Sequence, residues 1–133
     1  MSLYYVSPHR LARRIAALSE SQRPDVHIPV DVTADEEGFT LIALVPGLAP
    51  DQVSIEVLEE TITLRGEFQA PETGEGVRVL LSERPTGRFS RTLRLPASLD
   101  AARAEADVKQ GVLTVRVPKA ESAKAKQIKV KAK

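Results

Sequence analysis

The fold is decided by the stretch VSIEVLEETITLR at residues 53–65. Apolar side chains occupy every second position in both of its halves, namely Val53, Ile55 and Val57, then Ile62 and Leu64. A period of two places these side chains on one face of an extended backbone. The stretch therefore predicts two strands that each turn one face toward a core.

The same period extends outward over residues 24–118. The run at residues 39–45 is almost wholly apolar, which predicts a strand covered on both faces. No stretch in this region has the pattern of a crossover helix, so the sequence predicts an all-β, antiparallel β-sandwich rather than a parallel sheet. Further short runs, bounded by Pro or Gly, lie at residues 30–33, 89–95 and 112–117.

An Ala-rich segment at residues 97–106 gives two readings. Its composition locally favours a helix. Ala106 and Val108 are also placed to begin a strand ahead of the turn residue Gly111.

A long loop at residues 68–87 contains a second irregular pattern. Within it Val77, Val79 and Leu81 alternate with other side chains, as in a strand. A loop of this length inside a compact domain usually serves function or partner contact. A strand within it cannot easily join its own sheet and is a candidate to pair with another molecule.

Composition limits the class of protein. A chain of 133 residues with 42% apolar and 28% charged side chains is expected to form one soluble globular core. It has no cysteine, which excludes disulfides, thiolate nucleophiles and sulfur metal sites. Pro8 and the N-terminal arginines interrupt any secretory signal, and the uncharged run at residues 38–50 is too short to span a membrane. The expected location is cytoplasmic, without stable membrane insertion.

Charge divides the chain into three parts. An N-terminal arm, residues 1–25, carries four arginines and two carboxylates, whereas the domain, residues 26–118, carries nine basic and fifteen acidic side chains. The C-terminal extension, residues 119–133, carries six lysines and one Glu. This tail could be an arm for nucleic acid or a solubilising extension. Since it has neither Arg nor an aromatic residue, we expect no nucleic-acid partner.

The arm begins with helix signals, Ser7 as N-cap and Pro8 as first helical residue. A helix of about twelve residues is marginal alone, so its apolar stripe needs a partner. The stripe either docks on the chain's own domain or forms a sticky, partly ordered segment; a membrane-surface helix has thin support from so narrow a stripe. The apolar side chains concerned are Tyr4, Tyr5, Leu11, Ile15 and Leu18.

The tail carries Ile128 and Val130 after a Lys- and Ala-rich stretch at residues 120–126. That stretch has nothing to pack with and is interpreted as a solvated tether. The two β-branched side chains point to the same side of an extended backbone, across Lys129. They are either two knobs that enter a groove at another molecule's sheet edge or part of a frayed end.

Catalytic patterns are nearly absent from the sequence. His9 and His27 are too few for a typical His-based metal site, and there is neither a nucleophile elbow nor a phosphate-binding Gly-rich loop. The acidic cluster at residues 35–37 precedes Gly38 and is read as a solvated hairpin turn rather than an acid–base pair. We therefore expect no enzymatic activity and no cofactor.

Several short motifs nevertheless resemble those of one family, the small heat-shock proteins. Their order and spacing over residues 24–130 carry the resemblance. The motifs are PVDV at residues 29–32, LVPGL at 44–48, LRGE at 64–67, GRFSR at 87–91, GVLTV at 111–115 and IKV at 128–130.

This resemblance implies an immunoglobulin-like sandwich, the α-crystallin domain, and an ATP-independent chaperone that holds unfolded client proteins. It implies a homodimer formed by exchange of a loop strand, here bearing Val77, Val79 and Leu81, with Arg94 near the dimer interface. The arm is the part that contacts clients. The residues 59–60 stand where relatives usually carry a Gly- or Asn-containing turn.

The resemblance also implies higher homo-oligomers, in which Ile128 and Val130 dock between two strands of a neighbouring dimer. A co-chaperone-type sandwich for a single folded partner is the alternative; it needs neither the tail motif nor the long loop. The groove that accepts the tail is implied to contain Val53, Ile55 and Val57 on one strand, with Ala106 and Val108 on the other.

Overall fold

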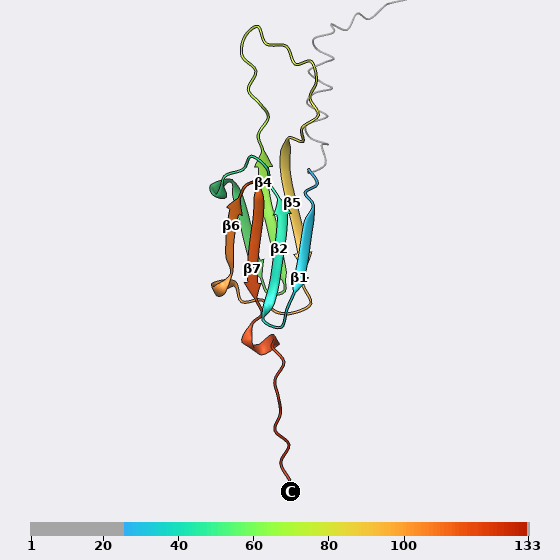
Figure 1. Ribbon diagram of the computed structural model, residues 1–133, viewed down its shortest axis with the longest axis vertical. Coiled ribbons are helices and arrows are strands. Elements are labelled where there is room, and N and C mark those ends of the chain that lie inside the picture. Colours follow the sequence, from blue (N-terminus) through green and yellow to red (C-terminus); the bar gives the residue numbers. More distant parts are fainter. Residues whose placement is uncertain (1–25, 133) are drawn as a thin grey trace, which may run out of the picture.

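Two antiparallel sheets pack face to face in the computed structural model, which describes residues 26–132 (Figure 1). One sheet has the strand order β1-β2-β7-β6 and the other β3-β4-β5. The predicted all-β antiparallel sandwich is therefore confirmed. The strands are β1 (Val30–Ala34), β2 (Gly38–Leu44), β3 (Val53–Leu58), β4 (Thr61–Phe68), β5 (Gly87–Arg94), β6 (Glu105–Lys109) and β7 (Val112–Pro118).

The stretch at residues 53–65 forms the hairpin of β3 and β4, with Ile55 opposite Leu64 and Val57 opposite Ile62. Paired residues lie on the same face of a sheet, so the alternating side chains all face inward, as predicted. They pack against the inward side chains of β2, β5 and β7. The fully buried part of this core includes Ile28, Phe39, Leu41, Val45, Ile62, Leu64, Phe89, Leu113, Val115 and Val117.

Glu59 closes the β3–β4 hairpin with a positive φ of 55°. Few residues other than Gly and Asn adopt this conformation readily. The turn also binds the segment after β5, because the Glu60 and Glu59 carbonyls accept hydrogen bonds of 2.8 Å from the amides of Leu95 and Leu99.

Gly66 on β4 makes room for a side chain of the neighbouring strand in the same sheet. A Cβ at this position would overlap the ring of Phe89, which lies on the paired strand β5. The same ring packs against Phe68 with centroids 5.2 Å apart. The absence of a side chain at residue 66 thus makes room for the buried ring of Phe89, against which the half-buried Phe68 packs.

The expectation that residues 39–45 are covered on both faces is wrong. Phe39 and Leu41 are buried, but Ile42 is 40% and Leu44 50% exposed on the other face. The second sheet covers only the inner face of β2, and the outer face stays partly exposed.

The helix favoured by the Ala-rich composition of residues 97–106 does not form. The segment contains one short 3₁₀ turn, η2 (Ala101–Arg103), and the alternative strand begins at Glu105 as β6. The Leu99 amide is bound to the Glu59 carbonyl and the Asp100 amide to that of Pro118, which leaves too few free residues for an α-helix.

The tether predicted at residues 120–126 is anchored over its first part. The Ala120 amide donates to the Ser98 carbonyl at 2.9 Å, and a 3₁₀ turn, η3 (Glu121–Ala123), follows. Lys124 Nζ then lies 3.0 Å from carboxylates of both Glu37 and Glu121. Small and charged side chains thus find backbone and ionic partners where they lack apolar ones, and the extended tail starts at residue 125.

The expectations for the arm, including its helix and the side chains of Tyr4, Tyr5, Leu11, Ile15 and Leu18, lie outside the described residues. Between residues 26 and 132 there is no helix with the length and apolar character needed to cross a membrane.

Candidate functional site

A groove separates β3 and β6, each of which is an edge strand of its own sheet. Each of these strands pairs on one side only, β3 with β4 and β6 with β7. Their inward side chains face each other across the gap and enclose a hollow of about 300 Å³. It is lined by Ile55, Val57, Ala101, Ala104, Glu105, Ala106 and Val115.

Three of the five predicted groove residues, Ile55, Val57 and Ala106, line this hollow. Val53 and Val108 are half-buried against the core and do not line it. The sequence analysis missed Ala101 and Ala104 among others, although the Ala-rich composition of residues 97–106 was the available signal. Small side chains there leave space above the core that larger residues would fill.

The predicted knobs of the tail are almost fully exposed, Ile128 at 83% and Val130 at 92%. The tail runs away from the sandwich beyond β7 and η3 (Figure 1). The chain therefore presents two exposed β-branched side chains and, separately, a groove lined mainly by aliphatic side chains.

Residues 77–81 lie in a long excursion that extends past the ends of β4 and β5 (Figure 1). Val77, Val79 and Leu81 are exposed, and the segment is not a strand within the single chain. Its pairing with a strand of another molecule stays a prediction. Both β1 and β5 have a free edge on which a further strand could add.

Arg94 ends β5, and its side chain is exposed. It forms an ion pair of 2.6 Å with Glu60 in the β3–β4 turn. The guanidinium therefore lies at the surface near a free sheet edge, and its role at a dimer interface stays a prediction.

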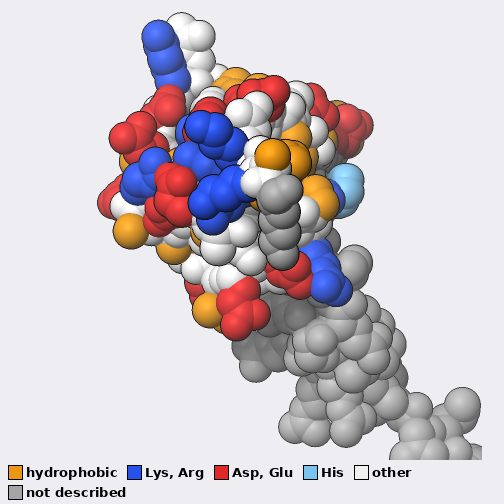
Figure 2. All heavy atoms as spheres, turned by 90° about the horizontal axis from the view of Figure 1, so that it is seen from below, with side chains coloured by type: hydrophobic (Ala, Val, Ile, Leu, Met, Phe, Trp, Pro, Cys, Tyr) orange, Lys and Arg blue, Asp and Glu red, His pale blue; other side chains and the backbone are white. Residues whose placement is uncertain are grey.

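Charged side chains gather at the end of the sandwich from which the tail leaves (Figure 2). Three ion pairs form among them: Arg116 with Asp35, Arg103 with Asp100, and Lys124 with Glu37. The hydrogen bond from Arg103 lowers the pKa of Asp100, and the hydrogen bond to Glu37 raises the pKa of Lys124. These pairs hold the base of the tail.

Asp35 belongs to the turn between β1 and β2, as the hairpin interpretation of residues 35–37 predicted. Its amide donates to the Gly38 carbonyl at 2.9 Å, and its carboxylate is bound by Arg116. Among the residues described, no cluster of three His, Cys, Asp or Glu side chains is placed to hold a metal ion.

The sequence model of the Hsp20/alpha crystallin family matches residues 31–131. The chain is 34% identical over 121 residues to the 18 kDa heat shock protein of Streptomyces albus G, covering 91% of this chain and 84% of that protein. It is 35% identical over 130 residues to the 18 kDa antigen of Mycobacterium leprae, covering 96% and 86%.

Solved structures give the same picture. Heat shock protein 16.0 from Schizosaccharomyces pombe matches with a TM-score of 0.66 and 33% identity, over 80% of this chain and 100% of that one. A small heat-shock protein from Xylella fastidiosa matches with a TM-score of 0.65 and 26% identity, over 82% and 100%. Fold, motifs and relatives agree: the chain belongs to the Hsp20/alpha crystallin family of small heat-shock proteins, a family of stress-response chaperones.

Proposed function

We propose that this protein is an ATP-independent holdase that binds partly unfolded proteins, prevents their aggregation and assembles as an oligomer of dimers. The single observation that carries this proposal is that one chain presents both exposed knobs and a groove that suits them. Ile128 and Val130 are exposed on the tail, while the groove between β3 and β6 is lined mainly by aliphatic side chains.

The chemistry of the tail suits the groove of a neighbouring subunit. Burying two β-branched side chains contributes about 1.5–3 kcal/mol each before ordering costs. Glu105 lies at the groove, and lysines flank the knobs at residues 126, 129 and 131, so the charges of the two surfaces are complementary. Because ordering the tail offsets much of the burial free energy, one tail binds weakly. Several tails in a closed assembly bind firmly because each raises the effective concentration of the next.

The proposed dimer uses the excursion that holds residues 77–81. Its three alternating aliphatic side chains are exposed, and the free edge of β1 offers unpaired backbone amides and carbonyls. Adding a strand to such an edge satisfies these groups and covers the aliphatic side chains. Arg94, at the end of another free edge, is proposed to lie near the same interface.

Clients are proposed to bind the N-terminal arm through Tyr4, Tyr5, Leu11, Ile15 and Leu18. Aggregating proteins expose apolar surface and strand edges, and a protein that binds such states lowers their free concentration without a nucleotide. The division into arm (1–25), domain (26–118) and extension (119–133), the cytoplasmic location and the absence of cofactors are parts of the same proposal.

Light scattering tests the activity. We expect the protein to suppress heat- or reduction-induced aggregation of an unrelated client at near-stoichiometric ratios with no ATP present. Removing residues 1–20 should weaken suppression and leave the β-sheet circular dichroism intact. Unchanged scattering across a tenfold excess of the full chain would contradict the proposal.

A further inference from the structure

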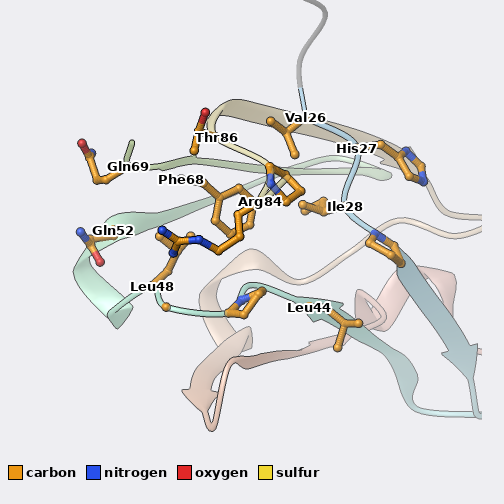
Figure 3. Close-up of a pocket in the computed structure, with 14 residues that line it drawn as sticks. Val26, His27, Ile28, Leu44, Leu48, Gln52, Phe68, Gln69, Arg84 and Thr86 are labelled. Atoms are coloured by element: carbon orange, nitrogen blue, oxygen red, sulfur yellow. The ribbon is translucent and has the colours of Figure 1, made fainter. Parts of the chain in front are cut away.

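A second hollow, of about 570 Å³, lies at the end of the sandwich opposite the tail. Figure 3 shows its lining, and Figure 1 shows the ends of β4 and β5 that border it. Its volume is within the usual range of ligand sites, ~300–1,000 Å³. Val26 and Ile28 bound it from the segment that leads into β1, and Phe68 from the end of β4 (Figure 3). Leu48, in the connection from β2 to β3, forms another wall.

The walls are mainly apolar, and Leu44, which is half exposed, continues them onto the outer face of β2. Apart from His27, Arg84 is the one ionisable side chain in this lining. It forms no ion pair with any residue between 26 and 132. The hollow therefore suits a segment that offers an apolar side chain and a carboxylate.

The undescribed N-terminal segment ends at this hollow. Its last residue, 25, is bonded to Val26, which is itself part of the lining. The Val26 amide donates to the Arg88 carbonyl at 2.8 Å and so fixes the place where the arm leaves the domain. The arm consequently has a far higher effective concentration at the hollow than any free molecule.

The arm also has the required chemistry. Leu18 lies eight residues before Val26, a contour of up to about 28 Å, which is long enough for the chain to turn back over the hollow. Leu18 ends the stripe that begins with Leu11 and Ile15. Glu20, two residues further on, is the one carboxylate side chain before residue 25.

We propose that this hollow is the docking site for the chain's own arm, with Leu18 seated against Leu48 and Phe68 and Glu20 paired with Arg84. An arm docked in this way covers its apolar stripe and the hollow together.

Engineered disulfides test the docking, since the chain has no cysteine of its own. The test variant combines Ser19→Cys, which leaves Leu18 in place, with Thr86→Cys, a residue that lines the hollow. The matched control combines Ser19→Cys with Ser90→Cys, an exposed position on β5 outside the lining. We expect mild oxidation to close the test disulfide within one chain at least tenfold faster than the control.

Two results would overturn the docking. Equal rates for the two variants would mean that Leu18 does not favour the hollow. A test disulfide that forms mainly between chains, seen as a covalent dimer on a non-reducing gel, would assign the hollow to the arm of another subunit.

Charge reversal tests the proposed ion pair in the same cross-linking variant. Arg84→Glu and Glu20→Arg should each slow disulfide closure several-fold, and the two together should restore it. Unchanged rates of disulfide closure in both single variants would show that Glu20 and Arg84 do not form the proposed ion pair.

Discussion

Arg116 and Asp35 are joined by two parallel hydrogen bonds, from Nη1 to Oδ2 at 2.8 Å and from Nη2 to Oδ1 at 2.9 Å. The same Oδ1 accepts from the amides of Glu37 at 2.8 Å and Gly38 at 2.9 Å. The Asp35 carboxylate therefore shapes the β1–β2 turn and also ties this turn to β7. Its partner on β7, Arg116, lies 81 positions further along the chain. The anchor of the tail is built on this turn, because Glu37 binds both Lys124 and the Lys119 amide.

This carboxylate gives a prediction for acid stability. Hydrogen bonds from Arg116 and from two backbone amides hold the pKa of Asp35 well below its ordinary value of 3.8. A group whose pKa is depressed by folding stabilises the protein above its unfolded pKa, and this contribution is lost as the pH falls toward the folded pKa. We expect the urea concentration at the unfolding midpoint to decrease when the pH falls below about 4. The variant Asp35→Asn should show a smaller decrease. Part of the decrease should remain, because folding lowers the pKa of Asp100 as well.

Two variants separate the charge from the turn. Asp35→Asn retains a side-chain oxygen for the amides of Glu37 and Gly38, whereas Asp35→Ala removes it. The Ala variant should therefore be the less stable of the two at pH 7. Parallel loss of stability in the wild type and the Asn variant between pH 5 and 3 would show that Asp35 does not cause the acid dependence.

The tail gives a prediction for assembly. Ile128→Ala with Val130→Ala should convert the oligomer into folded dimers, because each link loses two buried side chains worth about 1.5–3 kcal/mol apiece before ordering costs. Lys129→Ala is the matched control and should leave the mass unchanged, since its side chain points away from the knobs. Size-exclusion chromatography with light scattering measures both, and a wild-type mass for the double variant would identify the tail as a frayed end.

The long loop gives a prediction for the dimer. Deleting residues 77–81 should produce folded monomers, because it removes the three exposed aliphatic side chains proposed to pair with a partner. Deleting residues 71–75 shortens the same loop by the same length but removes no large aliphatic side chain, and should leave dimers intact. Native mass spectrometry decides the matter; dimers after the first deletion would mean that the subunits pair through another edge.

The β6–β7 hairpin gives a prediction for stability. Gln110 has a φ of 52° and Gly111 a φ of 77°, and two-residue hairpin loops with positive φ at both positions favour Asn-Gly. Gln110→Asn should therefore raise the free energy of unfolding by roughly 0.5–1 kcal/mol. Gln110→Val should lower it, because a β-branched residue fits this conformation poorly. Denaturation at matched protein concentration tests both, and reversed signs would exclude turn strain as the cause.

Most of the fold could be predicted from the sequence because its signal is local. The alternation in residues 53–65 sets the faces of β3 and β4 whatever the rest of the chain does, and Gly111 marks a turn by its own conformational freedom. Helix propensity in residues 97–106 was overridden by long-range hydrogen bonds at Leu99 and Asp100, which a local pattern cannot reveal. The partial exposure of Leu44 depends likewise on what the second sheet leaves uncovered.

The candidate site divides in the same way. Ile55, Val57 and Ala106 were predictable because edge strands that face each other must expose part of their inward side chains. Val115 and Ala104 were missed because they lie outside the two edge strands, and only the tertiary fold brings them to the groove. The anchored base of the tail was missed because Lys124 finds its partners in a turn far away in sequence.

The anchor at Lys124 limits the distance that the tail can span. Only three residues separate it from Ile128, so the knob reaches no more than about 14 Å from the anchored Cα. In the proposed assembly the groove of a neighbouring subunit must lie within that distance of Lys124. Subunits whose grooves lie further away cannot be linked by the tail. The ion pairs of one lysine would thereby narrow the range of particle sizes, whereas residues inserted between Lys124 and Ile128 would broaden it.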